Sequence, residues 1–101
     1  MIVYNVTLNV DEDIHNEWLL WMKLTHLPEV MATGKFKEYH IFKVLNKQVD
    51  ETGSTYAIQY FAETMQDYDD YAVNHAPTLQ HKTKEKFGEK VYAFRTLLEK
   101  I

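Results

Sequence analysis

Cysteine is absent from the 101 residues of this chain. The sequence can therefore form no disulfide, present no thiolate to a metal ion and supply no cysteine nucleophile. A chain that folds without disulfides fits a reducing compartment, so we predict a cytoplasmic location.

Proline and glycine are scarce, with two and three residues, whereas 46% of the residues are apolar and 14% are aromatic. This composition excludes disordered, collagen-like and linker-dominated chains. At this length we expect a single domain, residues 1–101, that buries roughly 65% of its extended-chain surface. No basic leader precedes the first apolar run, and acidic residues 11–13 follow it, so we expect neither a signal peptide nor a membrane anchor.

The motifs of several functional classes are also missing. The single serine, Ser54, falls in a polar stretch and the three glycines are isolated, so neither a serine triad nor a phosphate-binding loop is indicated. None of the five histidines lies four residues from another, so we predict no metal site, and no cofactor is predicted either. A formal charge of -4 argues against a nucleic-acid partner, because phosphate binding needs a concentrated basic surface.

Four segments have the period-two alternation of β-strands. In residues 2–10, one side carries Ile2, Tyr4, Val6, Leu8 and Val10, and the other carries Val3, Asn5, Thr7 and Asn9. Further strands are predicted at residues 39–45, 55–61 and 91–98. The polar stretch 46–54 predicts a hairpin connection that makes the second and third strands antiparallel neighbours.

Two segments have helical spacing, and a His-x-Pro sequence interrupts each of them. The first helix should begin at about Glu12, break or kink near His26 because of Pro28, resume to Val30, and end at the pair 33–34. The second should begin after Thr64, which forms a capping pair with residue 67, break at 75–77, and resume to residue 87.

The order of these elements is βαββαβ. Short matches between the two halves, such as His26-Leu27-Pro28 with His75-Ala76-Pro77, fit two βαβ units, although chance similarity in an aromatic-rich chain would also produce them. Right-handed crossovers then predict a ferredoxin-like α+β fold, in which both helices cover one face of a four-stranded antiparallel sheet.

The second face of this sheet should be mixed in character. By alternation it carries Val3, Asn5, Thr7 and Asn9 from the first strand and Thr55, Ala57, Gln59 and Phe61 from the third. Such a face can remain in water, stack nucleobases, or close against a second copy of itself to form an eight-stranded barrel. Residues 53–60 only faintly echo the motif of RNA-recognition modules and their basic setting is missing, which argues against RNA binding. The unlike faces of the first strand lead us to predict a homodimer.

Several motifs carry a resemblance to a known family: Met1-Ile2-Val3-Tyr4-Asn5-Val6-Thr7, Trp18-Leu19-x-Trp21-Met22, His26-x-Pro28-Glu29-Val30, Thr33-Gly34-x-Phe36, Tyr56-Ala57-Ile58-Gln59-Tyr60 and Ala93-Phe94-Arg95-Thr96. In this order they resemble a bacterial domain of unknown function, of about this length, in the dimeric α+β barrel superfamily. The resemblance covers the whole chain and implies a ferredoxin-like protomer that dimerises sheet to sheet, with no activity attached. The wider superfamily resembles quinone-forming monooxygenases, muconolactone isomerases and stress-responsive barrel proteins, which bind small aromatic or lactone molecules between sheet and helices; such analogy is a weak guide to function.

One candidate site is formed by Trp18, Trp21 and His26 beside the first helix break. A break can direct the imidazole of His26, our candidate catalytic residue, into a pocket floored by the two indoles, where its near-neutral pKa suits proton transfer. The alternative is that the tryptophans are core residues and His26 caps a helix.

Polar residues on the strands form a second set of candidate ligand-binding residues. They are Asn5, Thr7, His40, Gln59 and Arg95, with Arg95 as a clamp for an anion. Solubility of the edge strands or a salt bridge across the dimer would also explain them. A shift of one residue in register exchanges the two faces, so the sequence does not determine on which face His40 and Arg95 lie.

Two functions are compatible with these observations. The first is a small-molecule-binding dimeric α+β barrel that acts as a cofactor-independent enzyme on a small aromatic or lactone-like metabolite. The second is a non-catalytic binding or assembly protein whose sheet face serves only dimerisation.

Overall fold

The elements predicted from the alternation and the helical spacing follow one another in the structure. We describe residues 1–47 and 51–101 of a computed structural model. The elements are β1 (Ile2–Val10), a 3₁₀ turn (Glu12–Ile14), α1 (His15–Trp21), a π-helical segment (Met22–His26), α2 (Leu27–Ala32), β2 (Glu38–Lys43), β3 (Ser54–Ala62), α3 (Met65–Asn74), α4 (Ala76–Phe87), a second 3₁₀ turn (Gly88–Lys90) and β4 (Val91–Glu99).

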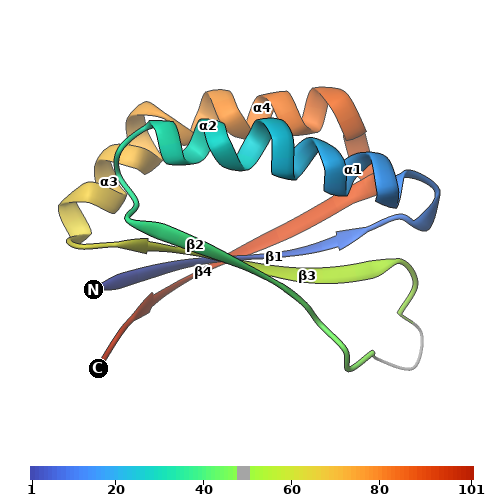
Figure 1. Ribbon diagram of the computed structural model, residues 1–101, viewed down its shortest axis with the longest axis horizontal. Coiled ribbons are helices and arrows are strands. Elements are labelled where there is room, and N and C mark those ends of the chain that lie inside the picture. The colour runs from blue at the N-terminus through green and yellow to red at the C-terminus, as the bar shows by residue number, and fades with distance from the viewer. Residues whose placement is uncertain (48–50) are drawn as a thin grey trace.

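The four strands form one antiparallel sheet in the order β2-β3-β1-β4, with β1 in a central position. Tyr4 on β1 lies opposite Tyr60 on β3 and opposite Leu97 on β4, which fixes the register across three strands. All helices cover one face of the sheet and leave the other face open (Figure 1). The predicted ferredoxin-like fold is confirmed.

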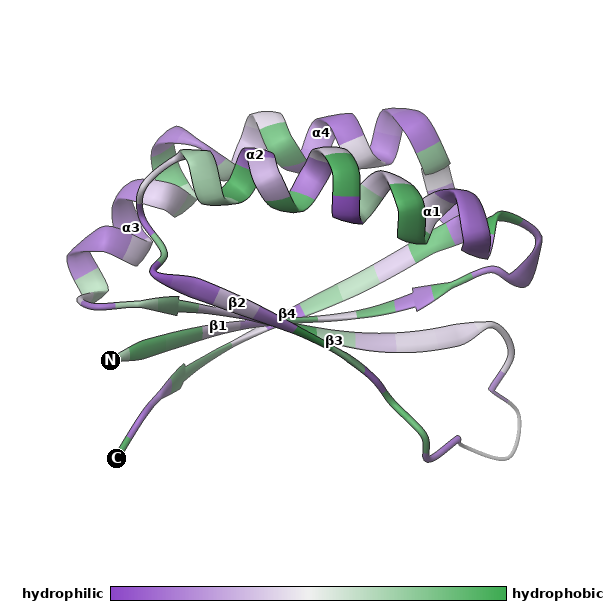
Figure 2. Ribbon diagram, viewed as in Figure 1, coloured by the Kyte–Doolittle hydropathy of each residue, from purple (hydrophilic) through white to green (hydrophobic). Residues whose placement is uncertain are grey.

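The core lies between the helices and the covered face of the sheet. The five residues predicted for the apolar side of β1 are all buried: Ile2, Tyr4, Val6, Leu8 and Val10. Hydrophilic and hydrophobic residues alternate along α1 and α4 (Figure 2), as expected for helices with one face on a core. Fully burying an aliphatic or aromatic side chain contributes roughly 1.5–3 kcal/mol, so this layer supplies most of the stability of the fold.

The first helical connection differs from its prediction at Pro28. Of the predicted break or kink near His26, the break does not occur, because the backbone remains helical there, with φ -68° and ψ -50° at His26 and φ -62° and ψ -43° at Leu27. A π-helical segment, Met22–His26, precedes the proline instead. Proline removes one backbone donor of the α-helical ladder, and a single wider turn accommodates that loss without ending the helix.

The second connection follows its prediction more closely. The backbone N–H of Asp67 donates to Oγ1 of Thr64 over 3.1 Å, which confirms the capping pair at the start of α3. The predicted break falls at His75, whose φ of -125° separates α3 from α4. Of residues 1–47 and 51–101, none belongs to a helix long and apolar enough to cross a membrane.

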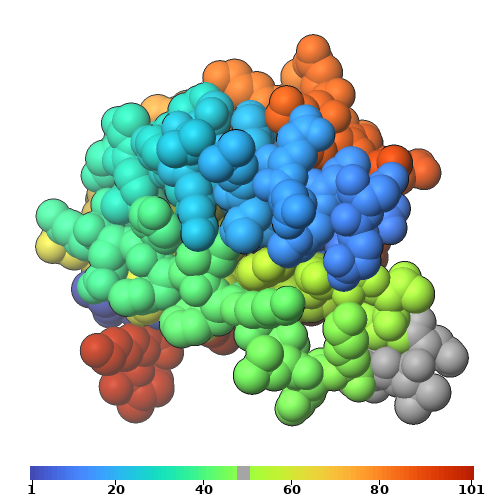
Figure 3. Space-filling model, turned by 45° about the vertical axis from the view of Figure 1, so that its right-hand side comes forward, coloured from blue at the N-terminus to red at the C-terminus, as the bar shows by residue number. Residues whose placement is uncertain are grey.

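The pairing of β2 with β3 is antiparallel, as predicted. β2 is shorter than predicted, but the backbone N–H of Val44 still donates to the carbonyl of Thr55 over 2.8 Å. Residues 48–50 of the predicted connection lie outside the described residues. Seen from the β2 side, α1 and α2 pack directly over this edge of the sheet (Figure 3).

Candidate functional site

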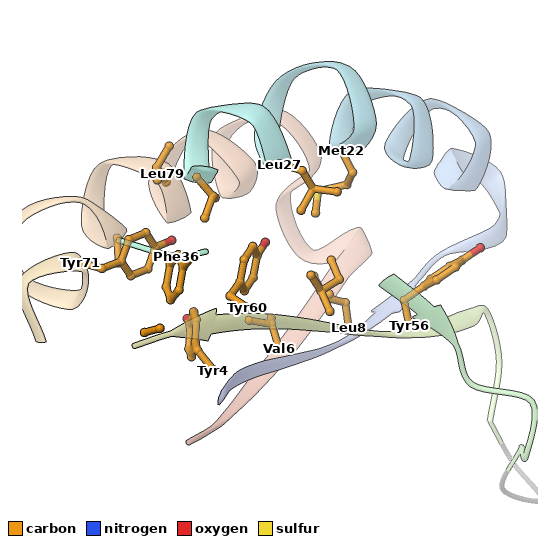
Figure 4. Close-up of a cluster of buried hydrophobic side chains, with 14 of the residues drawn as sticks. Tyr4, Val6, Leu8, Met22, Leu27, Phe36, Tyr56, Tyr60, Tyr71 and Leu79 are labelled. Carbon is orange, nitrogen blue, oxygen red and sulfur yellow. The ribbon is translucent and has the colours of Figure 1, made fainter. Parts of the chain in front are cut away.

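A cavity of about 610 Å³ lies between the covered face of the sheet and the helices. Its floor comes from β1, β3 and β4, and its other walls come from the π-helical segment, α3 and α4. Apolar side chains such as Val6, Leu8, Met22 and Ile58 form much of the lining. The polar groups that converge on it include Tyr4, His26, Tyr60, Tyr71, Gln80, Lys84, Glu89 and Arg95. Sheet and helix side chains meet in the same layer beside this space (Figure 4).

The candidate catalytic residue His26 lines this cavity. It ends the π-helical segment, and its ring stacks on that of Trp21 at 5.2 Å between centroids, with 26° between the planes. Burial lowers the pKa of His26 to about 4; the carboxylate of Glu29 opposes this change, whereas the positive charges of Arg95 and Lys82 add to it. The imidazole is therefore neutral at pH 7 and can both accept and donate a hydrogen bond.

Arg95 reaches the same cavity from β4. It lies opposite Val6 of β1, a residue of the covered face, so its side chain belongs to the helix side of the sheet. His40 lies opposite Gln59 of β3, and Gln59 lies opposite Asn5 of β1, which places His40 on the open face. The pairing register therefore separates two residues that the sequence grouped together.

The tyrosines beside the cavity are packed in an aromatic cluster. The ring of Tyr4 lies 5.8 Å from that of Tyr60 and 6.0 Å from that of Tyr71, between centroids. Burial raises the pKa of Tyr4, and Arg95 and Gln80 act near its hydroxyl to oppose that rise. Burial also raises the pKa values of Tyr60 and Tyr71, so all three hydroxyls are protonated hydrogen-bonding groups at pH 7.

The two tryptophans do not line the cavity. Trp18 is fully buried and packs on Tyr56 with 5.1 Å between centroids; its Nε1 has no hydrogen-bond partner among the described residues. Trp21 contacts the edge of Phe87 at 5.4 Å and holds His26 by stacking. Trp18 therefore has a core position, and Trp21 is connected to the cavity only through His26.

The other four candidate residues lie together on the open face. Gln59 stands between His40 and Asn5 in one row across the strands, and Thr7 lies two residues further along β1. Asn5 donates to Oγ1 of Thr7 over 3.1 Å, and Nε2 of His40 lies 3.0 Å from a carboxylate oxygen of Glu38. The sequence prediction that strand residues 5, 7 and 59 share a face is confirmed by this register, although the face is separate from the cavity.

Sequence reasoning missed most polar groups of the cavity, among them Tyr4, Tyr71 and Gln80. Tyr4 was assigned only to the core. Gln80 follows Ala76 by four residues and precedes Thr83 by three, so it stands on the inward side of α4. A long polar side chain in the inward stripe of a helix is a signal that could have found it. No such signal distinguishes Tyr71 from an ordinary core tyrosine.

Metal ligands are not grouped in the parts of the chain that the structure describes. No set of three or more histidine, aspartate or glutamate side chains there could hold a metal ion. The cavity offers a ligand hydrogen-bonding groups, the guanidinium of Arg95, the charged side chains of Lys84 and Glu89, and apolar walls.

Comparison with known proteins identifies the family. A family model, "Domain of unknown function (DUF4286)", matches residues 1–101. The chain belongs to the DUF4286 family. Comparison with curated proteins gives no match for this DUF4286 chain.

Solved structures show the same fold at low sequence identity. An ethyl tert-butyl ether d (EthD) family protein from Bacillus halodurans superposes with a TM-score of 0.73 and 12% identity, covering 100% of both chains. A candidate antibiotic biosynthesis monooxygenase from Deinococcus radiodurans superposes with a TM-score of 0.65 and 12% identity, covering 99% of this chain and 92% of the other. The hydroxynitrile lyase from Passiflora edulis superposes with a TM-score of 0.55 and 15% identity, covering 99% of this chain and 95% of the other. At these identities the likeness of the DUF4286 chain to them concerns the fold alone.

Proposed function

We propose that this protein binds a small molecule in the cavity between the covered sheet face and the helices. The observation that carries this proposal is the convergence of an imidazole, an amide, a guanidinium and tyrosine hydroxyls on one cavity of about 610 Å³. Small-molecule sites typically have volumes of roughly 300–1,000 Å³ and combine apolar walls with a few polar groups.

A packing defect would have a different lining. Empty cavities in protein cores are apolar, because buried polar groups require partners. Here His26, Gln80 and Arg95 come from three separate elements and meet around one space. This arrangement supports recognition of a ligand rather than imperfect packing.

The proposal is tested by screening small aromatic and lactone fragments against isotopically labelled protein by NMR. We expect the amide shifts that respond to a bound fragment to cluster around Tyr4, His26 and Gln80. Ala93→Leu, which extends a side chain into the cavity, should abolish these responses. Ala32→Leu adds the same atoms at an exposed position on α2 and should leave them unchanged. Responses that survive Ala93→Leu, or that never cluster at the cavity, would contradict the proposal.

We also propose that the open sheet face pairs with a second copy of this chain. Exposed apolar residues from both edge strands, Phe42 of β2 and Phe94 of β4, lie in one row with Ala57 and Thr7 between them. A polar row containing His40, Gln59 and Asn5 runs beside it. An isologous contact places each apolar rim on its counterpart, which removes exposed aromatic surface from water.

A matched pair of variants tests this assembly. Phe94 is 56% exposed on the open face, and Val73 is 73% exposed on α3, away from that face. We expect Phe94→Glu to shift the protein from dimer to monomer in native mass spectrometry and sedimentation, and Val73→Glu to leave the dimer intact. A wild-type protein that is monomeric at micromolar concentration would overturn the pairing.

The neutral imidazole of His26 favours a second function, a cofactor-independent enzyme that acts on a small aromatic or lactone-like metabolite. A neutral imidazole at the wall of a cavity can accept a proton from a bound molecule. Each fragment that binds in the NMR screen would be followed for conversion. We expect His26→Gln to retain binding and lose turnover. A variant that keeps turnover would exclude His26 as the proton acceptor, and absence of conversion by the wild type would leave only the binding function.

A further inference from the structure

Arg95 is the single arginine of the chain, and it is an exposed residue of β4. Seven ion pairs join the described residues, and none of them includes Arg95. Other cations of the chain are paired, as Lys82 is with Glu29 at 2.9 Å. A guanidinium has five donors in a planar fork, so Arg95 retains donors for a ligand.

The charge of Arg95 affects the pKa values of four side chains that line the cavity. It lowers the pKa values of Tyr4, Tyr60 and Tyr71 against the dominant effect of their burial, and it adds to the lowering at His26. A single cation that acts on four lining side chains gives this part of the cavity a positive potential.

The remaining charges of the lining do not cancel this potential. Lys84 adds a second positive charge and Glu89 contributes one negative charge, while His26 is neutral at pH 7. Two cations and one anion leave the cavity with a net positive charge, whereas the whole chain carries -4. The charge of the lining is therefore opposite in sign to that of the whole chain, which favours an anion over a cation as the ligand.

We propose that the ligand of this cavity is a small organic carboxylate, held through its carboxylate by Arg95, with its apolar body against Val6, Leu8 and Ile58. This inference rests on the proposed binding function and specifies the chemical class of the ligand. The planar fork of arginine matches the two oxygens of a carboxylate, which gives both orientation and affinity. Arg95 and Gln80 both act on the Tyr4 hydroxyl, and this hydroxyl and the Gln80 amide add neutral donors for the same group.

The test compares carboxylates with their neutral amides in isothermal titration. The probes are benzoate with benzamide and 2-naphthoate with 2-naphthamide, because each pair has the same apolar body and differs in charge. We expect each carboxylate to bind about 10-fold to 100-fold more tightly than its amide, the range given by hydrogen bonds to charged groups.

Two variants assign the preference to Arg95. Arg95→Gln should abolish the preference for carboxylates while amide binding persists; Lys23→Gln removes an exposed cation that does not line the cavity and should preserve the preference. Circular dichroism and thermal unfolding verify that both variants fold. Equal affinities of the wild type for carboxylate and amide, or a preference that survives Arg95→Gln, would overturn the carboxylate class and leave the binding function standing. Absence of binding by all four probes would overturn both.

Discussion

The rings of Trp21 and His26 stack one turn apart along a π-helical segment, with centroids separated by 5.2 Å. Their separation of five residues matches the i→i+5 spacing of a π-turn, which brings such residues onto one line of the helix surface. An α-helix would rotate the imidazole away from the indole. The π-turn that adapts the helix to Pro28 therefore also holds His26 in the wall of the cavity.

The first prediction concerns the pH dependence of stability. His26 has a pKa of about 4 in the folded protein and about 6.5 when unfolded, so the unfolded state binds more protons between these values. The wild type should lose stability as the pH falls from about 6.5 to about 4, by at most about 3 kcal/mol from this residue. In urea unfolding at fixed protein concentration, the free energy of unfolding of His26→Gln should not show this loss at low pH. If the free energy of unfolding depended on pH in the same way in the wild type and the variant, the assignment of this loss to His26 would be refuted.

The second prediction tests which charges set the pKa of His26. The groups that act on it are Glu29 of α2, Lys82 of α4 and Arg95 of β4. Arg95→Gln should raise this pKa, because a repelling cation is removed, and Glu29→Gln should lower it further. Titration of the imidazole resonances by NMR measures both shifts. Lys23→Gln is the control and should leave the value unchanged; shifts of equal sign in the first two variants are incompatible with this electrostatic account.

The third prediction concerns Gly53, which precedes β3. Its φ is +75°, and a Cβ added there would lie 2.5 Å from the backbone oxygen of Val10. Gly34 has a nearly equal φ of +76° with no atom within 4 Å of an added Cβ. Gly34→Ala should cost about 1 kcal/mol from the backbone conformation alone, and Gly53→Ala at least about twice that, because the obstructing atom is main chain. Chemical denaturation compares the two, and equal losses would show that the close approach is relieved without cost.

The sequence determined the elements and their faces. Alternation in residues 2–10 separated the buried side of β1 from the side that carries Asn5 and Thr7, because successive side chains of a strand point to opposite faces. Thr64 and the His75 break marked the helices of the second half, because caps and prolines act within a few residues.

The tertiary structure alone decided the site. Arg95 and His40 lie on opposite faces of the sheet because the pairing register assigns them so, and no local pattern fixes that register. The response of the helix to Pro28 was a π-turn rather than a break, which depends on how the surrounding turns pack. Tyr4, His26, Gln80 and Arg95 lie far apart in the sequence and meet only when the helices close over the sheet. Periodicity is a property of neighbouring residues, whereas a cavity is a property of the packing between distant ones.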